Sequence, residues 1–202
     1  CRRQPIKYRI TYHLNKGSGA ETGTYDVETP VTLPVPVKDG AEFLGWYDNA
    51  NLAGDPVSEI AAGNTGAKEY WAKWSLIEIE NVEEFEAFAQ SVNAGNNYKG
   101  QTVRLMNDLD MTGVTHKAIG NVGCPFEGIF DGMGHSIKNL TRVYEDFVNG
   151  LFGFIGEEGV VKNIKLINVD IIYDKIFGGG IAGHNEGTIS GCGVEGKILF
   201  EN

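Results

Sequence analysis

Residues 128–140 read GIFDGMGHSIKNL, residues 150–166 read GLFGFIGEEGVVKNIKL, and residues 180–194 read GIAGHNEGTISGCGV. Each segment begins with a glycine and two apolar residues, continues through a turn rich in Gly, Asn or Asp, and then restarts an alternating apolar run. The segments start 22 and 30 residues apart, a spacing that is typical of one supersecondary unit per repeat. The stretch from residue 128 to residue 196 therefore predicts a solenoid of stacked coils.

The apolar residues that follow these turns are the expected core of the solenoid, because burial between neighbouring coils holds such a stack together. The glycines and asparagines of the turns need no functional explanation, since glycine takes a positive φ without penalty. The expected core residues are Ile137, Leu140, Ile164, Leu166, Ile189 and Val194.

The composition predicts a folded chain with room for one large domain or two modest ones. Its 202 residues are 42% apolar and 10% aromatic, and they include 28 glycines but only 6 prolines. The net charge of −10 disfavours nucleic acid and anionic membranes as partners, because both attract basic surfaces. No run of about 18 apolar residues is present, so the sequence predicts no transmembrane segment.

Three widely spaced cysteines, Cys1, Cys124 and Cys192, provide neither a disulfide framework nor a zinc-binding spacing. Cys1 is either the lipid-bearing cysteine left after cleavage of a bacterial lipoprotein leader or an ordinary residue at which the sequence starts. We favour the lipid anchor, because the other features are typical of extracellular proteins. The four histidines form no metal-binding pair, and no Walker, Rossmann or G-x-S-x-G motif is present, so we expect no cofactor.

Residues 1–76 are expected to form a first, β-rich unit. Apolar and polar side chains alternate over residues 8–14, which is the pattern of a half-buried strand. Residues 15–23 contain three glycines and predict a hairpin turn. Two aromatic strands follow, FLGWY at residues 43–47 and YWAKW at residues 70–74, and we expect them to face one small core.

These segments resemble the Listeria–Bacteroides B repeat, a module of internalin-type surface proteins. The family pattern is an opening strand with a Gly/Asn turn, a proline segment, an F-x-GWY strand and a closing Y-x-A-K-W strand. Here these elements read YRITYHLNKGSG, TPVTLPVPVKDG, FLGWY and YWAKW. The turn at residues 15–19 departs from the usual glycine pair. The resemblance implies a small β-grasp, ubiquitin-like module on a secreted or wall-exposed protein.

Residues 81–94 predict one amphipathic helix. Asn81 followed by Glu84 is the signature of a helix N-terminus with Asn81 as the N-cap, and Gly95 is the expected stop. We expect the helix to cover the open end of the following β-stack, because unpaired strand edges invite association. Its apolar face comprises Val82, Phe85, Phe88, Ala89 and Val92.

From about Val82 onward, the chain resembles the GLUG-type region of bacterial surface proteins. The resemblance implies a right-handed parallel β-helix of the pectin-lyase-like kind. Phe177, Gly178 and Gly179 replace a shorter link, so we expect the loop before Gly180 to bulge out of the stack. The matching elements, in chain order, are the helix, LMNDLD, AIG, FEGIFDGMGHSIKNL, GLFG and GIAGHNEGTI.

The sequence as a whole predicts a mainly β protein. A β-grasp module is expected over residues 1–76, and a capping helix with the coils of a right-handed parallel β-helix over residues 77–202. The last motif runs to Phe200 without a polar capping segment, although the ends of solenoids need one. We therefore expect the chain to be truncated there, or a second copy to cover this open β-helix end by self-association.

Four aromatic residues of the first unit are candidates for stacking on sugar rings, because such side chains combine a flat apolar face with a polar edge. The alternative, which we favour, is that they fill the core of a module this small. The candidates are Trp46, Tyr47, Trp71 and Trp74.

Three carboxylates of the second unit allow a catalytic interpretation. Asp108 and Asp110 are expected on one face of a strand end, where Asp131 could join them, and paired carboxylates serve glycoside hydrolysis. We favour structural roles, because aspartate is common in turns and at strand ends. Asp108, Asp110 and Thr112 also match the start of a calcium loop, although Ile119 stands where such a loop carries glutamate.

The favoured function is a non-enzymatic, secreted or cell-surface bacterial module for adhesion or display. Its expected partner is a surface protein or a glycan of the host or of bacteria. The alternative is a polysaccharide lyase or glycoside hydrolase on the β-helix. Such an enzyme would use Arg104, Lys138 and Arg142 to neutralise a uronate.

Overall fold

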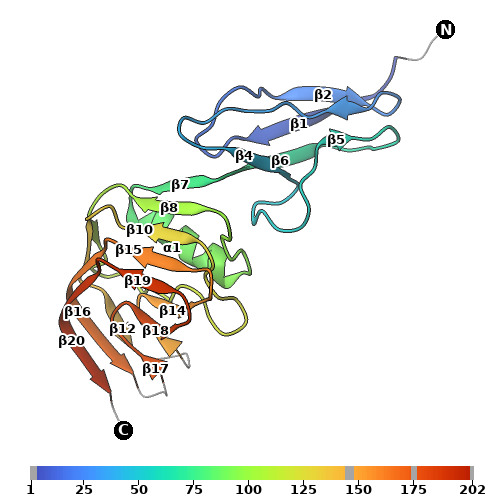
Figure 1. The fold of residues 1–202 in the computed structure, drawn as a ribbon. Coiled ribbons are helices and arrows are strands. Elements are labelled where there is room, and N and C mark those ends of the chain that lie inside the picture. The colour runs from blue at the N-terminus through green and yellow to red at the C-terminus, as the bar shows by residue number, and fades with distance from the viewer. Residues whose placement is uncertain (1–3, 144–147, 174–176, 201–202) are drawn as a thin grey trace. The chain divides into compact units, whose positions relative to one another are not determined.

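The computed structural model describes residues 4–143, 148–173 and 177–200, without the side chains of residues 142, 143 and 173. The fold is mainly β, with 47% of residues in strands and one short helix in the described part of the chain. Two compact units follow one another, Cys1–Leu76 and Ile77–Asn202 (Figure 1).

The first unit is built on a four-stranded mixed sheet with the order β2-β1-β6-β4. β1 and β6 are parallel neighbours at its centre, whereas β2 and β4 pair antiparallel at the edges; β3 and β5 form a separate antiparallel pair. No helix occurs among the described residues of this unit, and the β-grasp assignment stays a prediction. The strands are β1 (Lys7–His13), β2 (Gly23–Asp26), β3 (Val31–Thr32), β4 (Phe43–Tyr47), β5 (Glu59–Ile60) and β6 (Lys68–Trp74).

The aromatic strands β4 and β6 supply the core of the first unit, as the sequence predicts. Tyr70 and Trp74 on β6 point inward together with Trp46 on β4, and all three are buried. The indole N–H of Trp46 donates to the carbonyl of Pro34 at 2.7 Å, and that of Trp74 to the carbonyl of Leu14 at 2.9 Å. The buried rings thus satisfy their polar atoms, as interior tryptophans usually do.

Gly45 explains the glycine of the FLGWY segment. The pairing of β4 with β6 is irregular between Phe43 and Gly45, and Gly45 has a φ of +134°. A Cβ at this position would lie 2.6 Å from the Cβ of Pro56. Only glycine fits both the backbone conformation and the space at this bulge.

The second unit is a β-solenoid of about four turns, in agreement with the predicted solenoid class (Figure 1). One sheet has the order β19-β15-β10-β8-β7; a second has the order β12-β16-β11-β9, with β20 also pairing with β16. The strands of these two sheets are β7 (Leu76–Ile79), β8 (Thr102–Leu105), β9 (Leu109–Asp110), β10 (Ile129–Asp131), β11 (Ser136–Lys138), β12 (Thr141–Val143), β15 (Val160–Lys162), β16 (Lys165–Tyr173), β19 (Thr188–Ser190) and β20 (Gly193–Phe200).

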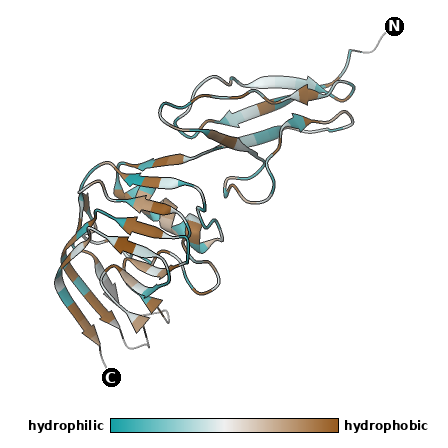
Figure 2. Ribbon diagram, viewed as in Figure 1, coloured by the Kyte–Doolittle hydropathy of each residue, from teal (hydrophilic) through white to brown (hydrophobic). Residues whose placement is uncertain are grey.

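The strands stack in parallel register, and every second residue points into the core. Val103, Phe130, Val161 and Ile189 occupy one inward row through β8, β10, β15 and β19. Such stacking of hydrophobic residues is visible along the strands of this unit in Figure 2. The handedness of the coil stays a prediction.

The coil register corrects the repeat alignment drawn from sequence. Gly150 and Gly180 do stack, because Phe152 lies opposite Ala182. Gly128 instead corresponds to Gly159, since Ile129 lies opposite Val160. The coils are therefore roughly 30 residues long throughout, and the 22-residue interval compares two different corners of the coil that share a glycine-apolar pattern.

A third face contains two short parallel pairs. β13 (Val148–Asn149) pairs with β17 (Phe177–Gly178), and β14 (Phe152–Ile155) pairs with β18 (Ala182–Asn185). The segment at Phe177 therefore belongs to the stack. Phe177 and Gly178 pair with Val148 and Asn149 and so do not bulge out of the stack, whereas the register shifts by one residue between Gly178 and Ala182.

Helix α1 (Val82–Asn93) begins and ends where the sequence predicts. The Asn81 side chain accepts a hydrogen bond from the amide of Glu84 at 2.9 Å, and Gly95 ends the helix with a φ of +106°. Phe85 and Phe88 are buried and contact the ring of Phe130 in the solenoid core. The apolar face of α1 thus closes the interior beside the first coils.

The expected core is only partly correct. Ile137 and Ile164 are fully buried, but Ile189 is 37% and Val194 is 41% exposed. Both exposed residues lie in the last described rung, where no further described coil covers them. The rows of apolar residues that are buried inside the stack therefore become partly exposed at β19 and β20.

Candidate functional site

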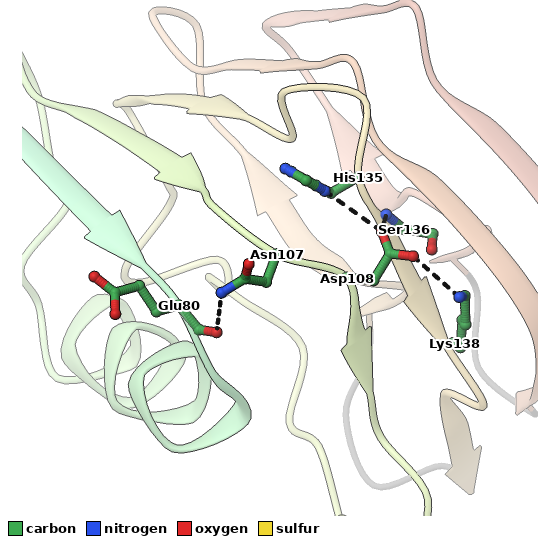
Figure 3. Close-up of polar contacts among 6 residues, drawn as sticks. All are labelled: Glu80, Asn107, Asp108, His135, Ser136 and Lys138. Atoms are coloured by element: carbon green, nitrogen blue, oxygen red, sulfur yellow. Dashed lines mark hydrogen bonds and ion pairs between the residues drawn. The ribbon is translucent and has the colours of Figure 1, made fainter.

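A cluster of polar contacts lies at a corner of the solenoid, where the chain leaves β8 and enters β9. We call it the polar corner and define it by Asp108, Asp110, Thr112, Ser136, Lys138, Asn139 and Asn168. The side-chain amide of Asn107 donates to the carbonyl of Glu80 at 2.9 Å and thus ties the beginning of this corner to the end of β7 (Figure 3). The strands on either side of the corner, β8 and β9, belong to two different sheets.

Asp108 is held by donors of the next coil (Figure 3). It accepts from the amide of Ser136 at 2.9 Å and from Nζ of Lys138 at 3.0 Å, and Nδ1 of His135 lies 3.5 Å away. The backbone hydrogen bond from Ser136, followed by the bond from Lys138, holds the pKa of Asp108 well below its usual range. This carboxylate is an ionised acceptor that ties β9 to β11.

Asp110 is a second carboxylate that accepts several hydrogen bonds. Its Oδ1 accepts from the hydroxyl of Thr112 at 2.6 Å, from the Thr112 amide at 3.0 Å and from Nδ2 of Asn139 at 2.8 Å. The hydroxyl bond of Thr112 and the amide bond of Asn139 are the main causes that lower the pKa of Asp110 to about 2.

An asparagine ladder continues this contact through the stack. Nδ2 of Asn168 donates to Oδ1 of Asn139 at 2.7 Å, and Nδ2 of Asn139 donates to Asp110. Asn139 and Asn168 both adopt left-handed backbone conformations, with φ of 58° and 55°. Asparagine tolerates this conformation better than most residues. The recurrence of KNL and INV one coil apart is a signal from which sequence reasoning could have found the ladder.

Asp131 lies on the other sheet and has partners of its own. Its Oδ1 accepts from the amide of Met133 and from Nδ2 of Asn163, each at 3.0 Å, and Nζ of Lys162 lies 3.3 Å from Oδ2. Burial raises the pKa of Asp131, but these three donors outweigh it and lower the pKa overall. Arg104 is the cross-strand neighbour of Asp131 in β8.

The three aspartates have separate hydrogen-bond partners, and the catalytic interpretation stays a hypothesis. Asp108, Asp110 and Asp131 contact separate sets of donors, and Asp131 belongs to a different sheet from Asp110. Within the described residues no group of three His, Cys, Asp or Glu side chains could hold a metal ion. The calcium interpretation of Asp108, Asp110 and Thr112 stays a prediction.

The structure separates the four aromatic candidates of the first unit. Trp46 is 1% and Trp74 is 3% exposed, so neither offers a ring face to a sugar. Tyr47 is also buried, and Nζ of Lys73 lies 5.2 Å from the centre of its ring. Trp71 alternates outward on β6 and stays partly exposed. The prediction that Trp46, Tyr47 and Trp74 stack on glycans is therefore wrong, because these rings are buried in the core.

Trp71 is flanked by residues that the sequence analysis did not connect with it. The imidazole of His13 on β1 stacks on the indole with 4.4 Å between ring centres and 6° between planes. Nε2 of His13 lies 2.9 Å from Oε2 of Glu69. The parallel pairing of β1 with β6 places His13 beside Trp71, a relationship that 58 residues of sequence separation conceal.

A buried polar pair also escaped the sequence analysis. Nδ1 of His116 lies 2.6 Å from Oε1 of Glu86 on α1, and Nε2 lies 3.4 Å from the carbonyl oxygen of Leu151. The His116 side chain is fully buried and stacks on the ring of Phe85. This pair joins α1 to the coils beside it. An isolated histidine in a loop carries no pattern that would predict it.

Some expectations lie outside the described residues. Cys1, the expected lipid anchor, falls before residue 4, and the side chain of Arg142 is not described. Arg104 and Lys138 lie on different sheets, and Lys138 is paired with Asp108. Across the described residues, no helix combines the length and the apolar character needed to cross a membrane.

Fold and contacts define this chain as a small mixed β-sheet unit followed by a β-solenoid. Residues 8–67 match the family model of the Listeria-Bacteroides repeat domain. This match confirms the B-repeat part of the resemblance.

Two relatives match most of the chain. Halomucin of Haloquadratum walsbyi is 28% identical over 142 residues, which are 68% of this chain and 2% of halomucin. A protein of Evansella cellulosilytica, provisionally named a Gly-rich membrane protein, is 30% identical over 160 residues, which are 74% of this chain and 17% of that protein. The chain thus spans a small part of each relative, and no solved structure matches it.

Proposed function

We propose that this chain is a non-enzymatic module of a bacterial cell-surface or secreted protein, which displays a binding surface for a glycan or a protein. The observation that carries the proposal is the combination, in one chain, of a Listeria-Bacteroides repeat with a β-solenoid. Such repeats occur in surface proteins, and the name of one relative refers to a membrane protein.

The polar contacts support a structural rather than a catalytic role for the carboxylates. A general acid must carry its proton near the working pH, whereas Asp108, Asp110 and Asp131 all have lowered pKa values. Each of them accepts hydrogen bonds from the next coil. Their chemistry is that of links between coils, which suits a rigid scaffold.

The finer assignments belong to the same proposal. We assign the first unit to the β-grasp class, because its parallel central pair with antiparallel edge strands is the sheet arrangement of that class. We assign the second unit to the GLUG-type, right-handed parallel β-helices on the motifs from LMNDLD to GIAGHNEGTI. Adhesion and lipid anchoring at Cys1 are proposals of the same kind.

Surface exposure of the full-length protein is the direct test. Intact cells of the native host are treated with proteinase K, and the protein is followed with an antibody raised against this chain. We expect loss of the signal from intact cells, while a cytoplasmic control protein survives until lysis. Protection of the chain until lysis would refute the proposal.

The enzymatic alternative has its own experiment. The purified chain is incubated with polygalacturonate, alginate and neutral polysaccharides, and reducing ends and unsaturated sugars are measured. We expect neither product above the level of a heat-denatured control. Release of either product would establish the lyase or hydrolase alternative.

A further inference from the structure

A hollow of about 530 Å³ lies in the first unit beside the edge of β6. The pairing of β4 with β6 stops at Tyr47 and Trp71, so the beginning of β6 has no β4 neighbour on that edge. The hollow occupies this region. Its polar lining residues are Asp48, Glu59, Asn64, Lys68 and Glu69, and its apolar lining residues are Val57, Ile60, Ala67, Tyr70 and Trp71.

Trp71 lines this hollow, and its ring is held in place by the stacking of His13. His13 stacks on the indole of Trp71, and Trp71 but not His13 lines the hollow. Glu69 holds His13 in place at 2.9 Å. A ring that is already fixed loses little conformational freedom when a ligand packs on it.

Polar residues line the hollow together with Trp71. Glu59 is an exposed carboxylate without an ion pair among the described residues, and Asn64 donates one hydrogen bond to the carbonyl of Ala61. Both retain hydrogen-bonding capacity for a ligand. A flat apolar face beside a few carboxylate and amide groups is the chemistry that binds a sugar ring, which has C–H groups on its face and hydroxyls on its rim.

The charge of the lining residues limits the class of sugar that the hollow can bind. Asp48, Glu59 and Glu69 face only one basic side chain, Lys68, in this hollow. Uronates and sulfated sugars would be repelled by this excess of negative charge. We propose that the hollow beside Trp71 binds a neutral saccharide unit, stacked on the indole and hydrogen-bonded to Glu59 and Asn64. The inference deepens the proposed display function by naming a ligand class, and it rests on that function.

The test uses the full chain and defined oligosaccharides. Cellotetraose, mannotetraose and tetra-N-acetylchitotetraose are titrated by calorimetry, and ligand protons in contact are identified by saturation-transfer NMR. We expect at least one of them to bind with contacts on a ring face. Trp71→Ala should weaken that binding roughly tenfold, with smaller losses for Glu59→Gln and Asn64→Ala. Galacturonate oligomers should not bind.

Matched controls separate the site from general effects. Phe177→Ala removes a 46% exposed aromatic ring from the second unit and should leave the affinity unchanged. If Trp71→Ala does not fold, Trp71→Leu and Glu59→Gln provide the same comparison in a folded chain.

Three results would overturn the proposal: no binding of any neutral oligosaccharide, binding that survives all substitutions in the hollow, or binding of galacturonate oligomers as tight as that of the neutral ones. These outcomes leave the protease-exposure test unaffected, so the display function and its ligand class fail independently.

Discussion

Nδ2 of Asn168 donates to Oδ1 of Asn139 at 2.7 Å, and the two residues occupy the same corner of successive coils in the same left-handed conformation. Asn139 in turn donates to Asp110. One short side chain therefore stabilises an unfavourable backbone conformation and joins three coils. Asparagine ladders stabilise stacked strands in this manner.

Asn139→Ala should destabilise the solenoid unit by about 2 kcal/mol, because it removes the bonds to Asp110 and Asn168 and because alanine tolerates a positive φ less well than asparagine does. Asn139→Gly is the matched control, since it removes the same bonds without backbone strain. We expect a smaller loss for glycine, measured by urea unfolding followed by circular dichroism. Equal stability of the alanine variant and the parent chain would contradict the ladder.

Acid should weaken the solenoid unit. The folded pKa of Asp110 is about 2 against an ordinary value of 3.8, and the pKa of Asp131 is lowered as well. A carboxylate whose pKa is lower in the folded chain stabilises the fold at pH values above the pKa of the unfolded chain. This contribution is lost as the pH falls through the pKa of the folded chain. We expect the urea midpoint of this unit to fall between about pH 4 and pH 2.

The measurement can be confined to one unit. All three tryptophans lie in the first unit, so their fluorescence does not report on the solenoid. The amide NMR signals of β11 and β16 report on the solenoid, because both strands belong to it. Asp110→Asn should show a shallower pH dependence than the parent chain, and a midpoint that is constant from pH 5 to pH 2 would count against the acid effect.

The His116–Glu86 pair should be essential for docking of α1. Glu86→Ala leaves a buried imidazole without its partner, and an unsatisfied buried polar group costs about 1–3 kcal/mol. Thermal unfolding should show this loss. Gln90→Ala, on the exposed side of the same helix, should change stability by less than about 0.5 kcal/mol. Similar effects of the two substitutions would show that the pair contributes nothing specific.

Gly45→Ala should destabilise the first unit by about 2 kcal/mol or more, because a Cβ there combines positive φ with a contact of 2.6 Å to Pro56. Gly54→Ala isolates the backbone effect, since Gly54 has a φ of +87° and open space around it. Tryptophan fluorescence during urea unfolding measures both. If Gly54→Ala were the more damaging change, the clash with Pro56 would be excluded as the cause.

Local signals explain which elements could be predicted. The caps of α1 at Asn81 and Gly95, the strand FLGWY and the alternation along β6 are written in consecutive residues, where propensity and periodicity act directly. The partial exposure of Trp71 is consistent with its place in the YWAKW alternation, but the favoured prediction placed all four aromatic candidates in the core. The contact between Tyr47 and Lys73 of the neighbouring strand could not be predicted in this way, because it joins two strands.

The sequence by itself determined the mainly β class, the solenoid, the position of the helix and the B-repeat resemblance, because these depend on patterns within a few residues or one coil. Only the tertiary structure decided that Gly128 stacks with Gly159, that Asp110 meets Asn139, and that His13 covers Trp71. Each of these relationships joins residues that are close only after the coils or strands are placed in register. Register is a property of the whole packed core, because a shift by one residue would turn every buried side chain outward.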